Sequence, residues 1–299
     1  MRLGCIGVGS NAIRLLCAQW ADGRLCHDLR ERRGTRLFAG LCAGMLTKES
    51  MDASVKAVGE LAQLARRDGA QKVFVFATSA VRDALNGGEF TARASEAAGA
   101  PVEIISGEEE ARLSYIGASE GGKCGVVDIG GGSTEFTLGD GEMILGVRSL
   151  QMGAVRMNAQ TPILCEADYV ETLQCCMKII RRDASELIRL PARTYWVGVG
   201  GTMTTLGAMQ KGTPVFLPDV CEGMTIELED VAQWGRRLSR MTMGERRQIT
   251  GLMPQRADII PSGVAILEAA MRCFDVGEMR LSAHGNMDGF LKEKFKEMC

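Results

Sequence analysis

A glycine-centred turn between two apolar runs carries the clearest chemistry in this sequence. A β-rich run delivers Asp128, residues 130–132 are three consecutive glycines, and a second β-rich run leaves from Glu135. Glycines let backbone N–H groups approach an anion closely, and Ser133 and Thr134 add hydroxyl donors. An aspartate at the strand end can hold a hard cation beside that anion. Taken alone, the stretch is equally compatible with an ordinary hairpin.

Residues 5–15 repeat the pattern when Gly9 is placed over Gly130, with an apolar run, a glycine turn and a second apolar run. Two such hairpins predict a duplicated βββαβα-type unit whose halves face each other across a cleft. The repeat is broken at one position, because the residue that matches Asp128 is Gly7. Only one of the two hairpins therefore supplies a carboxylate.

A third glycine turn follows a third strand-like run. Residues 195–199 lead into Gly200, Gly201 and Thr202, and residues 203–211 are compatible with a helix. We expect Thr202 to cap that helix, so that its N-terminal amides face a ligand. Two facing glycine hairpins and a Gly-Gly-Thr helix start form the phosphate-binding layout of the actin-like ATPase and sugar-kinase superfold.

Two further side chains are candidates for the same site. Residues 106–111 follow a strand-like run and open a helix with three consecutive glutamates. The serine that begins the stretch and Glu109 fit a capping box, and acids suit a helix N-terminus, but neither explains Glu110. If this helix start lines the cleft, Glu110 is the natural general base for activating a water. Arg82 has two interpretations: a solvent-facing partner of Asp83, or a planar fork that neutralises phosphate oxygens.

The elements that must position these residues alternate between strands and helices, which argues for an α/β fold with mixed central sheets. The apolar pattern predicts strands at residues 2–8, 13–19, 25–33, 72–77 and 102–105. It predicts helices at residues 53–67, 88–97 and 166–188, and from about 228 onward. The expected domains are residues 1–120 and 121–299, and the C-terminal helix is an element that can pack back on the first domain.

Composition excludes several classes of protein. The 299 residues suffice for two domains, and a net charge of −2 offers no basic field to attract nucleic acid. No apolar run reaches the roughly 20 residues of a membrane span. The N-terminus passes directly into a strand-like run without a signal-peptide cleavage site. We therefore expect a cytoplasmic protein with no nucleic-acid partner and no membrane partner.

Cysteine and histidine usage narrows the chemistry further. The eleven cysteines are scattered, odd in number and without a C-x-x-C pair, which favours reduced thiols in the core over a disulfide framework. The two histidines, His27 and His284, cannot form a histidine metal cluster and weaken any histidine-based triad. Chemistry is expected to depend on carboxylates, arginine and backbone amides.

Together these residues resemble the exopolyphosphatase and guanosine pentaphosphate phosphohydrolase (Ppx/GppA) family in its short, two-domain form. That resemblance implies two actin-like domains (ribonuclease H-like, of the ASKHA superfold) that face each other across a cleft. The likeness runs nearly end to end, and the order and spacing of its motifs are highly specific. The matching positions are residues 9–11 with Arg14, 77–79 with Arg82 and Asn86, 106–111, 128–135, Ser149 with Gly153 and Arg156, 200–202, and 256–260.

The resemblance implies hydrolysis of a terminal phosphoanhydride of inorganic polyphosphate or of guanosine pentaphosphate (pppGpp to ppGpp). Glu110 matches the family's catalytic glutamate, which would deprotonate the attacking water, and Arg82 matches its substrate-phosphate arginine. Asp128 and Glu135 match acids near Mg²⁺ (or Mn²⁺) and the water, so Glu135 is a candidate for both roles. Expected phosphate-binding residues are Gly9, Ser10, Asn11, Gly130, Gly131, Gly132, Ser133, Thr134, Gly200, Gly201 and Thr202. A homodimer is left open.

Three departures from the family pattern stand out. Position 7 is Gly where the family usually has Asp, and Ala12 replaces a usual Ser. Both changes bear on magnesium affinity and turnover. Near the C-terminus, Met287 occupies a position where Arg is common. The extra helical domain of longer members, with its HD metal motif, is not expected, since two histidines cannot supply it.

Other functions stay open beside the hydrolase. A catalytically weakened polyphosphate or alarmone-binding protein is supported by Gly7, because loss of one second-shell carboxylate costs about 10- to 100-fold in metal affinity or activity. An ATP-dependent kinase of the same superfold is disfavoured by a glutamate placed to activate water. The related iron–sulfur ATPase activators need cluster cysteines, which the scattered thiols do not provide. The sequence does not choose between polyphosphate and guanosine pentaphosphate, because both present a similar terminal phosphate.

Overall fold

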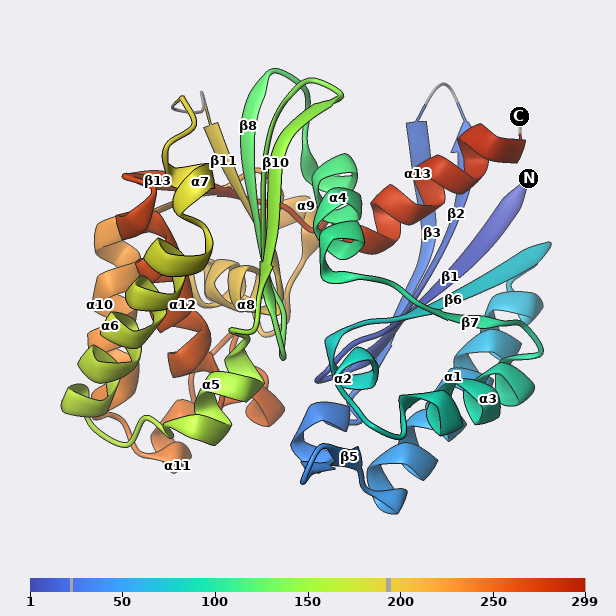
Figure 1. Cartoon of the computed structure of the whole chain (residues 1–299), viewed down its shortest axis with the longest axis horizontal. Coiled ribbons are helices and arrows are strands. Elements are labelled where there is room, and N and C mark those ends of the chain that lie inside the picture. The colour runs from blue at the N-terminus through green and yellow to red at the C-terminus, as the bar shows by residue number, and fades with distance from the viewer. Residues whose placement is uncertain (22–23, 192–194, 299) are drawn as a thin grey trace. The chain divides into compact units, whose positions relative to one another are not determined.

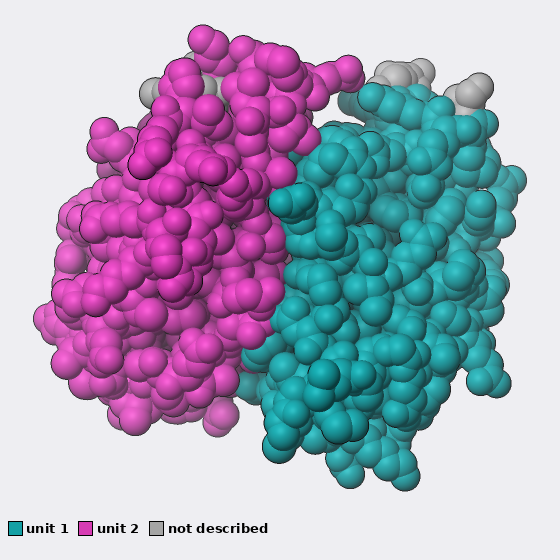
Figure 2. All heavy atoms as spheres, viewed as in Figure 1, with its two compact units in different colours: residues 1–117, 286–299 teal, residues 118–285 magenta. Residues whose placement is uncertain are grey.

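The computed structural model describes residues 1–21, 24–191 and 195–298. The chain divides into two compact units, shown in teal and magenta in Figure 2. Unit 1 comprises Met1–Gly117 and Asn286–Cys299, and unit 2 comprises Ala118–Gly285. The C-terminal helix therefore belongs with the N-terminal part of the chain rather than with the segment that precedes it.

The sheet of unit 1 has the order β3-β2-β1-β6-β7. Its first three strands form an antiparallel meander, and β6 and β7 then continue the sheet parallel to β1. The bounds are β1 Arg2–Val8, β2 Ile13–Ala21, β3 Arg24–Arg33, β6 Lys72–Ala77 and β7 Val102–Ile104. All five strands were predicted within a few residues.

Helices cover both faces of this sheet. A Cβ on Gly4 would contact Ala65 of α1, whereas a Cβ on Gly7 would contact Met287 of α13, so the two helices pack on opposite faces. Figure 1 shows α13 lying along β1 and β2 within unit 1. The helices of unit 1 are α1 Lys48–Arg67, α2 Ser79–Arg82, α3 Gly87–Ala98, α4 Gly107–Ala118 and α13 Asn286–Met298. The segment between β3 and α1 contains a short 3-10 helix, η1 Leu37–Gly40, and a separate two-stranded sheet of β4 Leu41–Cys42 and β5 Met45–Leu46. Helix α1 begins five residues before its predicted start, because Thr47 caps it by accepting from the Ser50 N–H.

The sheet of unit 2 repeats the same plan. Its order is β10-β9-β8-β11-β13-β12, again with an antiparallel meander followed by two strands parallel to the first. The bounds are β8 Lys123–Ile129, β9 Thr134–Asp140, β10 Met143–Leu150, β11 Tyr195–Gly200, β12 Thr225–Glu227 and β13 Glu278–Leu281. The shared strand order is that of an actin-like unit, so the predicted duplication is present in the fold.

Helices α6 and α12 form the main layer against the sheet of unit 2, and α10 packs on both. The core contains an aromatic group in which Phe274 stacks on Phe136 at 5.4 Å and lies 4.9 Å from Trp196. The helices of unit 2 are α5 Ala154–Gln160, α6 Glu166–Asp183, α7 Ser185–Ile188, α8 Gly201–Lys211, α9 Pro218–Cys221, α10 Leu228–Arg240, α11 Met243–Arg246 and α12 Ile260–Cys273, with η2 Pro254–Arg256.

Several sequence predictions for unit 2 were wrong. The helix predicted at residues 166–188 is interrupted at Ala184, which separates α6 from α7. The region predicted as helical from 228 onward contains strand β13, and strand β12 was not predicted; strand β10 was implied by the duplicated βββαβα-type unit, but without bounds. These strands are short or have exposed apolar residues, so they lack the alternation of a half-buried strand.

The ten cysteines that the structure describes are all free thiols. Cys5, Cys17, Cys124, Cys176 and Cys221 are buried, as expected for small core residues. No helix among the described residues has both the length and the apolar character needed to span a membrane.

Candidate functional site

The three consecutive glutamates at the start of α4 have different environments. Glu108 is exposed, and Glu109 receives two hydrogen bonds from Arg112 at 2.8 and 2.7 Å. Glu110 is 7% exposed and faces into unit 1. The Ser106 hydroxyl accepts from the Glu109 N–H at 3.0 Å, so Ser106 caps the helix as predicted, but the Glu109 carboxylate, predicted to complete a capping box, binds Arg112 instead. Solvent and a surface ion pair thus account for the side chains of Glu108 and Glu109, whereas the burial of Glu110 needs another explanation.

Arg82 lies beside Glu110. Its Nη1 donates to the Ile105 carbonyl at 2.9 Å and to Glu110 Oε2 at 3.4 Å. Asp83, the partner that the alternative interpretation gave it, accepts from Ser79. The Nη2 of Arg82 is buried and has no hydrogen-bond partner among the described residues. A buried guanidinium nitrogen without a partner costs free energy, which an anionic oxygen bound there would recover.

The second oxygen of Glu110 contacts a residue from the far end of the chain. Asn286 Nδ2 lies 3.5 Å from Glu110 Oε1, and Asn286 Oδ1 accepts from Arg14 Nη2 at 3.4 Å. Asn286 is the first residue of α13 and is 4% exposed. Arg82 and Asn286 therefore hold the two carboxylate oxygens of Glu110 from either side. The sequence gave Asn286 no role, and no local signal could have revealed it.

The two glycine hairpins have the same closing bond. Gly9 N–H donates to the Ala12 carbonyl at 3.2 Å, and Gly130 N–H donates to the Ser133 carbonyl at 3.0 Å. When Gly9 is aligned with Gly130, Ala12 is aligned with Ser133, so the two closing bonds are equivalent. The structure thus confirms the repeat that the sequence predicted. The hairpins differ in that Ser133 has a buried hydroxyl and Ala12 has none.

The hairpin between β8 and β9 presents its N–H groups on one side. The carbonyls of Gly130, Gly131 and Gly132 accept bonds from residues 154–156 of α5 at 2.7 to 3.0 Å. In a trans peptide the N–H points opposite to the C=O, and the described chain contains no cis peptide. The N–H groups that follow these carbonyls, those of residues 131–133, are therefore directed away from α5, as in an anion-binding nest.

The hairpin between β1 and β2 is held in a similar way. The Ser10 carbonyl accepts from Phe38 N–H at 2.8 Å, and the Asn11 carbonyl accepts from Arg36 N–H at 3.1 Å. By the same trans-peptide geometry, the N–H groups of Asn11 and Ala12 point away from residues 36–38. Each unit thus contains one candidate phosphate-binding hairpin.

The third turn differs from the prediction at Thr202. Helix α8 begins at Gly201, and its N-cap is Gly200, whose φ of 94° favours glycine. Thr202 is fully buried inside the first turn, and its hydroxyl has no partner among the described residues. Thr202 therefore does not cap the helix. The guanidinium of Arg256 lies directly against Gly201, where an added Cβ would be 2.3 Å from its Nη1.

Asp128 and Glu135 face each other across β8 and β9, with exposures of 8% and 2%. Glu135 Oε1 accepts from Ser149 Oγ at 2.7 Å. An added Cβ on Gly200 would lie 2.9 Å from Asp128 Oδ1, and one on Gly285 would lie 3.9 Å from Oδ2, so glycines keep the space around this carboxylate clear.

The carboxylates of Asp128 and Glu135 could supply only part of the ligands that a magnesium ion needs. Among the described residues, no group of three or more His, Cys, Asp or Glu side chains could enclose a metal ion. Magnesium is commonly held by one or two carboxylates, waters and substrate phosphates rather than by a protein cage. The donor set at Asp128 and Glu135 is compatible with an ion that the substrate helps to bind.

Comparison with known proteins identifies the family of this chain. Residues 18–298 match the model of the Ppx/GppA phosphatase family. The chain belongs to that family. Its Ppx/GppA relatives include exopolyphosphatase 2 of Mycobacterium tuberculosis, which is 32% identical over 96% of this chain and 97% of the relative.

Solved Ppx/GppA structures superpose on the whole chain. The Aquifex aeolicus family member is 28% identical, with a TM-score of 0.83 over 99% of this chain and 98% of that chain. A Cytophaga hutchinsonii exopolyphosphatase, at 24% identity, shows the same fold with a TM-score of 0.89 over 99% and 98% of the two chains. The predicted family and the predicted actin-like fold are thus confirmed.

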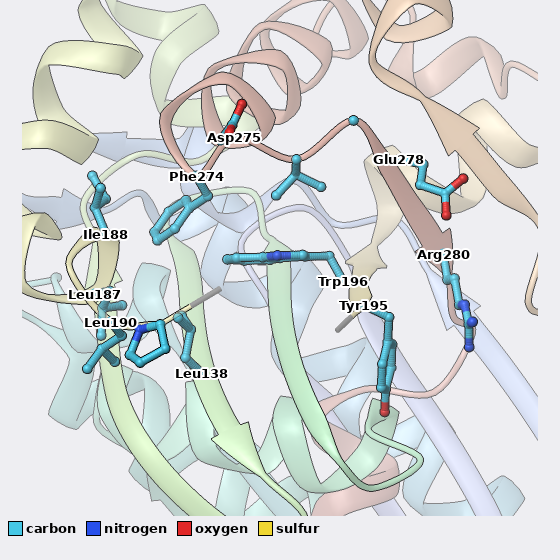
Figure 3. Close-up of a pocket in the computed structure, with 13 residues that line it drawn as sticks. Leu138, Leu187, Ile188, Leu190, Tyr195, Trp196, Phe274, Asp275, Glu278 and Arg280 are labelled. Carbon is cyan, nitrogen blue, oxygen red and sulfur yellow. The ribbon is translucent and has the colours of Figure 1, made fainter. Parts of the chain in front are cut away.

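A separate pocket in unit 2 does not have the character of a phosphate site. Figure 3 shows this pocket of about 250 Å³, in which Phe274 and Trp196 lie near Leu138, Leu187 and Leu190. It lies by Tyr195 at the start of β11, whereas the glycine turn follows the end of that strand. Among the described residues that line it, the one cationic side chain is Arg280, whose guanidinium carbon lies 5.0 Å from the centroid of the Tyr195 ring.

Proposed function

We propose that this protein is an exopolyphosphatase, which releases orthophosphate from the end of inorganic polyphosphate. Family membership and the relationship to exopolyphosphatase 2 support this activity. The observation that carries the proposal is the environment of Glu110, which is buried and held at both oxygens by Arg82 and Asn286. A carboxylate in such a position suits proton transfer better than helix capping.

In the proposed reaction a water attacks the terminal phosphorus, and Glu110 accepts its proton. The bond between that phosphorus and the bridging oxygen breaks, and the shortened chain leaves with the bridging oxygen. The free Nη2 of Arg82 would bind an equatorial oxygen of the transferred group, and the hairpin N–H groups would bind other phosphate oxygens. Phosphoryl transfer depends mainly on such positioning and charge neutralisation.

We also propose Mg²⁺ (or Mn²⁺) as the cofactor, held by Asp128 with Glu135 beside it. When bound, the ion would neutralise phosphate charge. Glu135 accepts a hydrogen bond from Ser149, which restricts rotation of its carboxylate and supports a role in orienting the attacking water. Phosphate release should depend on added magnesium and stop with a chelator.

The test is phosphate release from polyphosphate by the native protein, by Glu110→Gln and by the control Glu109→Gln. Glu110→Gln should lower turnover roughly 10²- to 10⁴-fold, the usual contribution of a general base. Glu109→Gln changes the same charge one residue away, at a surface pair with Arg112, and should stay near the native rate. Equal rates for the native protein and Glu110→Gln would refute the assignment.

Guanosine pentaphosphate is the second proposed substrate, because its terminal phosphate could accept the same hydrogen bonds from the hairpin N–H groups. Both substrates should be compared across one magnesium titration.

Gly7 supports a second function, that of a catalytically weakened protein that binds polyphosphate or an alarmone. Tight binding with no phosphate release above the Glu110→Gln background would favour that function.

A further inference from the structure

The carboxyl ends of three parallel strands meet at one edge of the sheet of unit 2. Strands β8 and β13 both pair in parallel with β11, and ligands of α/β proteins bind outside the carboxyl ends of such strands. β8 leads there to Asp128 and its glycine hairpin, and β11 leads to the turn at Gly200. β13 leads to residues 282–285, for which the sequence indicated no role. This segment is called the β13 loop below.

The β13 loop lies directly beside the candidate metal ligand. Its first residue, Ser282, donates its N–H to the Gly198 carbonyl of β11 at 3.0 Å. Its last residue is Gly285, where an added Cβ would lie 2.8 Å from Val199 Cγ1 and 3.9 Å from Asp128 Oδ2. A single added methyl group would therefore touch the Asp128 carboxylate. An outward shift of the loop would give that carboxylate room to turn.

Glu222 binds the β13 loop through both of its carboxylate oxygens. Oε1 accepts from Ser282 Oγ at 2.8 Å, and Oε2 accepts from the Ala283 N–H at 2.6 Å. The Ser282 hydroxyl in turn accepts from the His284 N–H at 3.0 Å. Hydrogen bonds to an ionised carboxylate are about twice as strong as neutral ones, and linked bonds strengthen one another. One side chain thus supports polar groups of three successive loop residues.

The backbone around Glu222 has hydrogen bonds of its own. The Glu222 N–H donates to the Pro218 carbonyl at 2.8 Å, at the end of α9. Gly223 N–H donates to the carbonyl of Leu281, the last residue of β13, at 2.9 Å, and Leu281 N–H donates to the Met224 carbonyl at 2.8 Å. The carboxylate therefore extends from a segment joined to the sheet toward a loop outside regular secondary structure. No local pattern marks this contact, because Glu222 and its first partner are 60 residues apart in the chain.

We propose that Glu222 is a positioning residue for Asp128. It holds the β13 loop beside the Asp128 carboxylate, so that this carboxylate keeps one orientation toward the ion. The role rests on the proposed function, in which Asp128 holds magnesium. Magnesium demands nearly octahedral ligand geometry, and partners that orient its ligands commonly contribute about 10- to 100-fold in metal affinity or activity. Glu222 acts through the loop and is not itself a ligand of the ion.

The first test measures the order of the loop by hydrogen exchange of the full-length protein without ligand. Glu222→Gln keeps the size of the side chain but removes its charge. The Ala283 amide should then exchange roughly 10- to 100-fold faster, the value of one hydrogen bond to a charged group. The melting temperature should stay near native, because the opening is local.

The matched control is Glu171→Gln. It removes the same charge from an exposed site on α6, where no hydrogen bond or ion pair involves Glu171 within the described part of the chain. Exchange of the Ala283 amide in this variant should equal that of the native protein.

The second test measures Mn²⁺ binding by calorimetry at a fixed concentration of methylenediphosphonate. The bridging carbon of this compound prevents hydrolysis, and its oxygens can complete the shell of the ion. Glu222→Gln should weaken Mn²⁺ binding about tenfold, and Glu171→Gln should bind like the native protein. A glutamate that only stabilises the fold would lower the melting temperature but leave the Mn²⁺ affinity of folded molecules unchanged.

The third measurement is the kinetics of phosphate release from polyphosphate with saturating magnesium. Glu222→Gln should lower kcat about tenfold and leave KM near native, because the phosphate-binding hairpins are unchanged. Glu171→Gln should keep the native values of both constants.

These outcomes separate the positioning role from the proposed function. Native Mn²⁺ affinity and kcat in Glu222→Gln, or unchanged exchange of the Ala283 amide, would overturn the role even if the protein hydrolyses polyphosphate. Equal losses in Glu171→Gln would overturn it as well. If the native protein binds Mn²⁺ but releases no phosphate, the hydrolase proposal fails, while a selective loss of Mn²⁺ affinity in Glu222→Gln still upholds the role. Absence of Mn²⁺ binding in the native protein would overturn it.

Discussion

The thioether of Met287 fills the space beside Gly7. A Cβ on residue 7 would lie 3.3 Å from Met287 Sδ and 3.5 Å from the Phe76 ring. The sequence showed these two positions as separate departures from the family, 280 residues apart in the chain. In the structure they are neighbours, so an apolar contact occupies the place where the family pattern leads one to expect an acid and a base.

Restoring both charges should therefore be less harmful than restoring one. Gly7→Asp would place a carboxylate against Met287 and should lower the free energy of unfolding by about 2 kcal/mol. Adding Met287→Arg should recover at least about 1 kcal/mol, because contacting residues couple by this order. Urea unfolding of the four proteins of the cycle measures the coupling. Additive effects would show that the two positions are independent.

Arg82→Lys should separate charge from geometry at the proposed phosphate site. The lysine keeps the positive charge but loses the fork that binds Ile105 and Glu110 while leaving Nη2 free. We expect phosphate release at saturating polyphosphate to fall about tenfold or more, with little change in melting temperature. A native rate in Arg82→Lys would show that charge alone suffices.

Gly153→Ala should damage the hairpin between β8 and β9 through steric overlap alone. Gly153 has an ordinary φ of −125°, but an added Cβ would lie 2.4 Å from backbone atoms of Gly131. Overpacking of this kind costs about 1–3 kcal/mol, and phosphate release should fall with stability. The control Gly88→Ala enters open space in a helix and should stabilise by roughly 0.5–1 kcal/mol. Thermal unfolding of both variants would detect the opposite signs.

Cys176 predicts a loss of stability at alkaline pH. Burial, and then Cys175, raise the pKa of Cys176 to about 12. The native thiol thus keeps its proton above the unfolded pKa of about 8.5, so its stabilising effect is full below that pH and is lost as pH rises toward 12. Between pH 8.5 and 10, the unfolding free energy of Cys176→Ala should fall less steeply than that of the native protein. Cys42→Ala, at an exposed site in unit 1, should follow the native curve; parallel curves for all three would contradict the assignment.

The sequence predicted best what is encoded locally. A hairpin is specified by the residues of its own turn, so Gly9 and Gly130 could be aligned without knowledge of the fold. The break after α6 has neither Gly nor Pro to mark it, and β13 has only four residues, two of them charged. Tertiary packing decides such elements, and a single sequence contains little sign of it.

For the site, the sequence distinguished Glu110 from its neighbours because helix capping explained only Glu109. It did not predict Asn286, because a contact over 176 residues leaves no local pattern. The predicted N-cap, Thr202, lies two positions after the observed one, since Gly200 is the N-cap and the helix begins at Gly201. The roles of Arg82, Asp128 and Glu135 stay predictions.

The return of α13 to unit 1 has a consequence for biosynthesis. A ribosome makes the chain from its N-terminus, and a domain usually folds as soon as its residues have emerged. Here one face of the sheet of the first unit stays uncovered until Asn286–Met298 has been synthesised, while the second unit, Ala118–Gly285, is free to fold earlier. Nascent chains released before Asn286 would expose Phe76 and lack the amide that contacts Glu110, so chains that stop before α13 should be prone to aggregate.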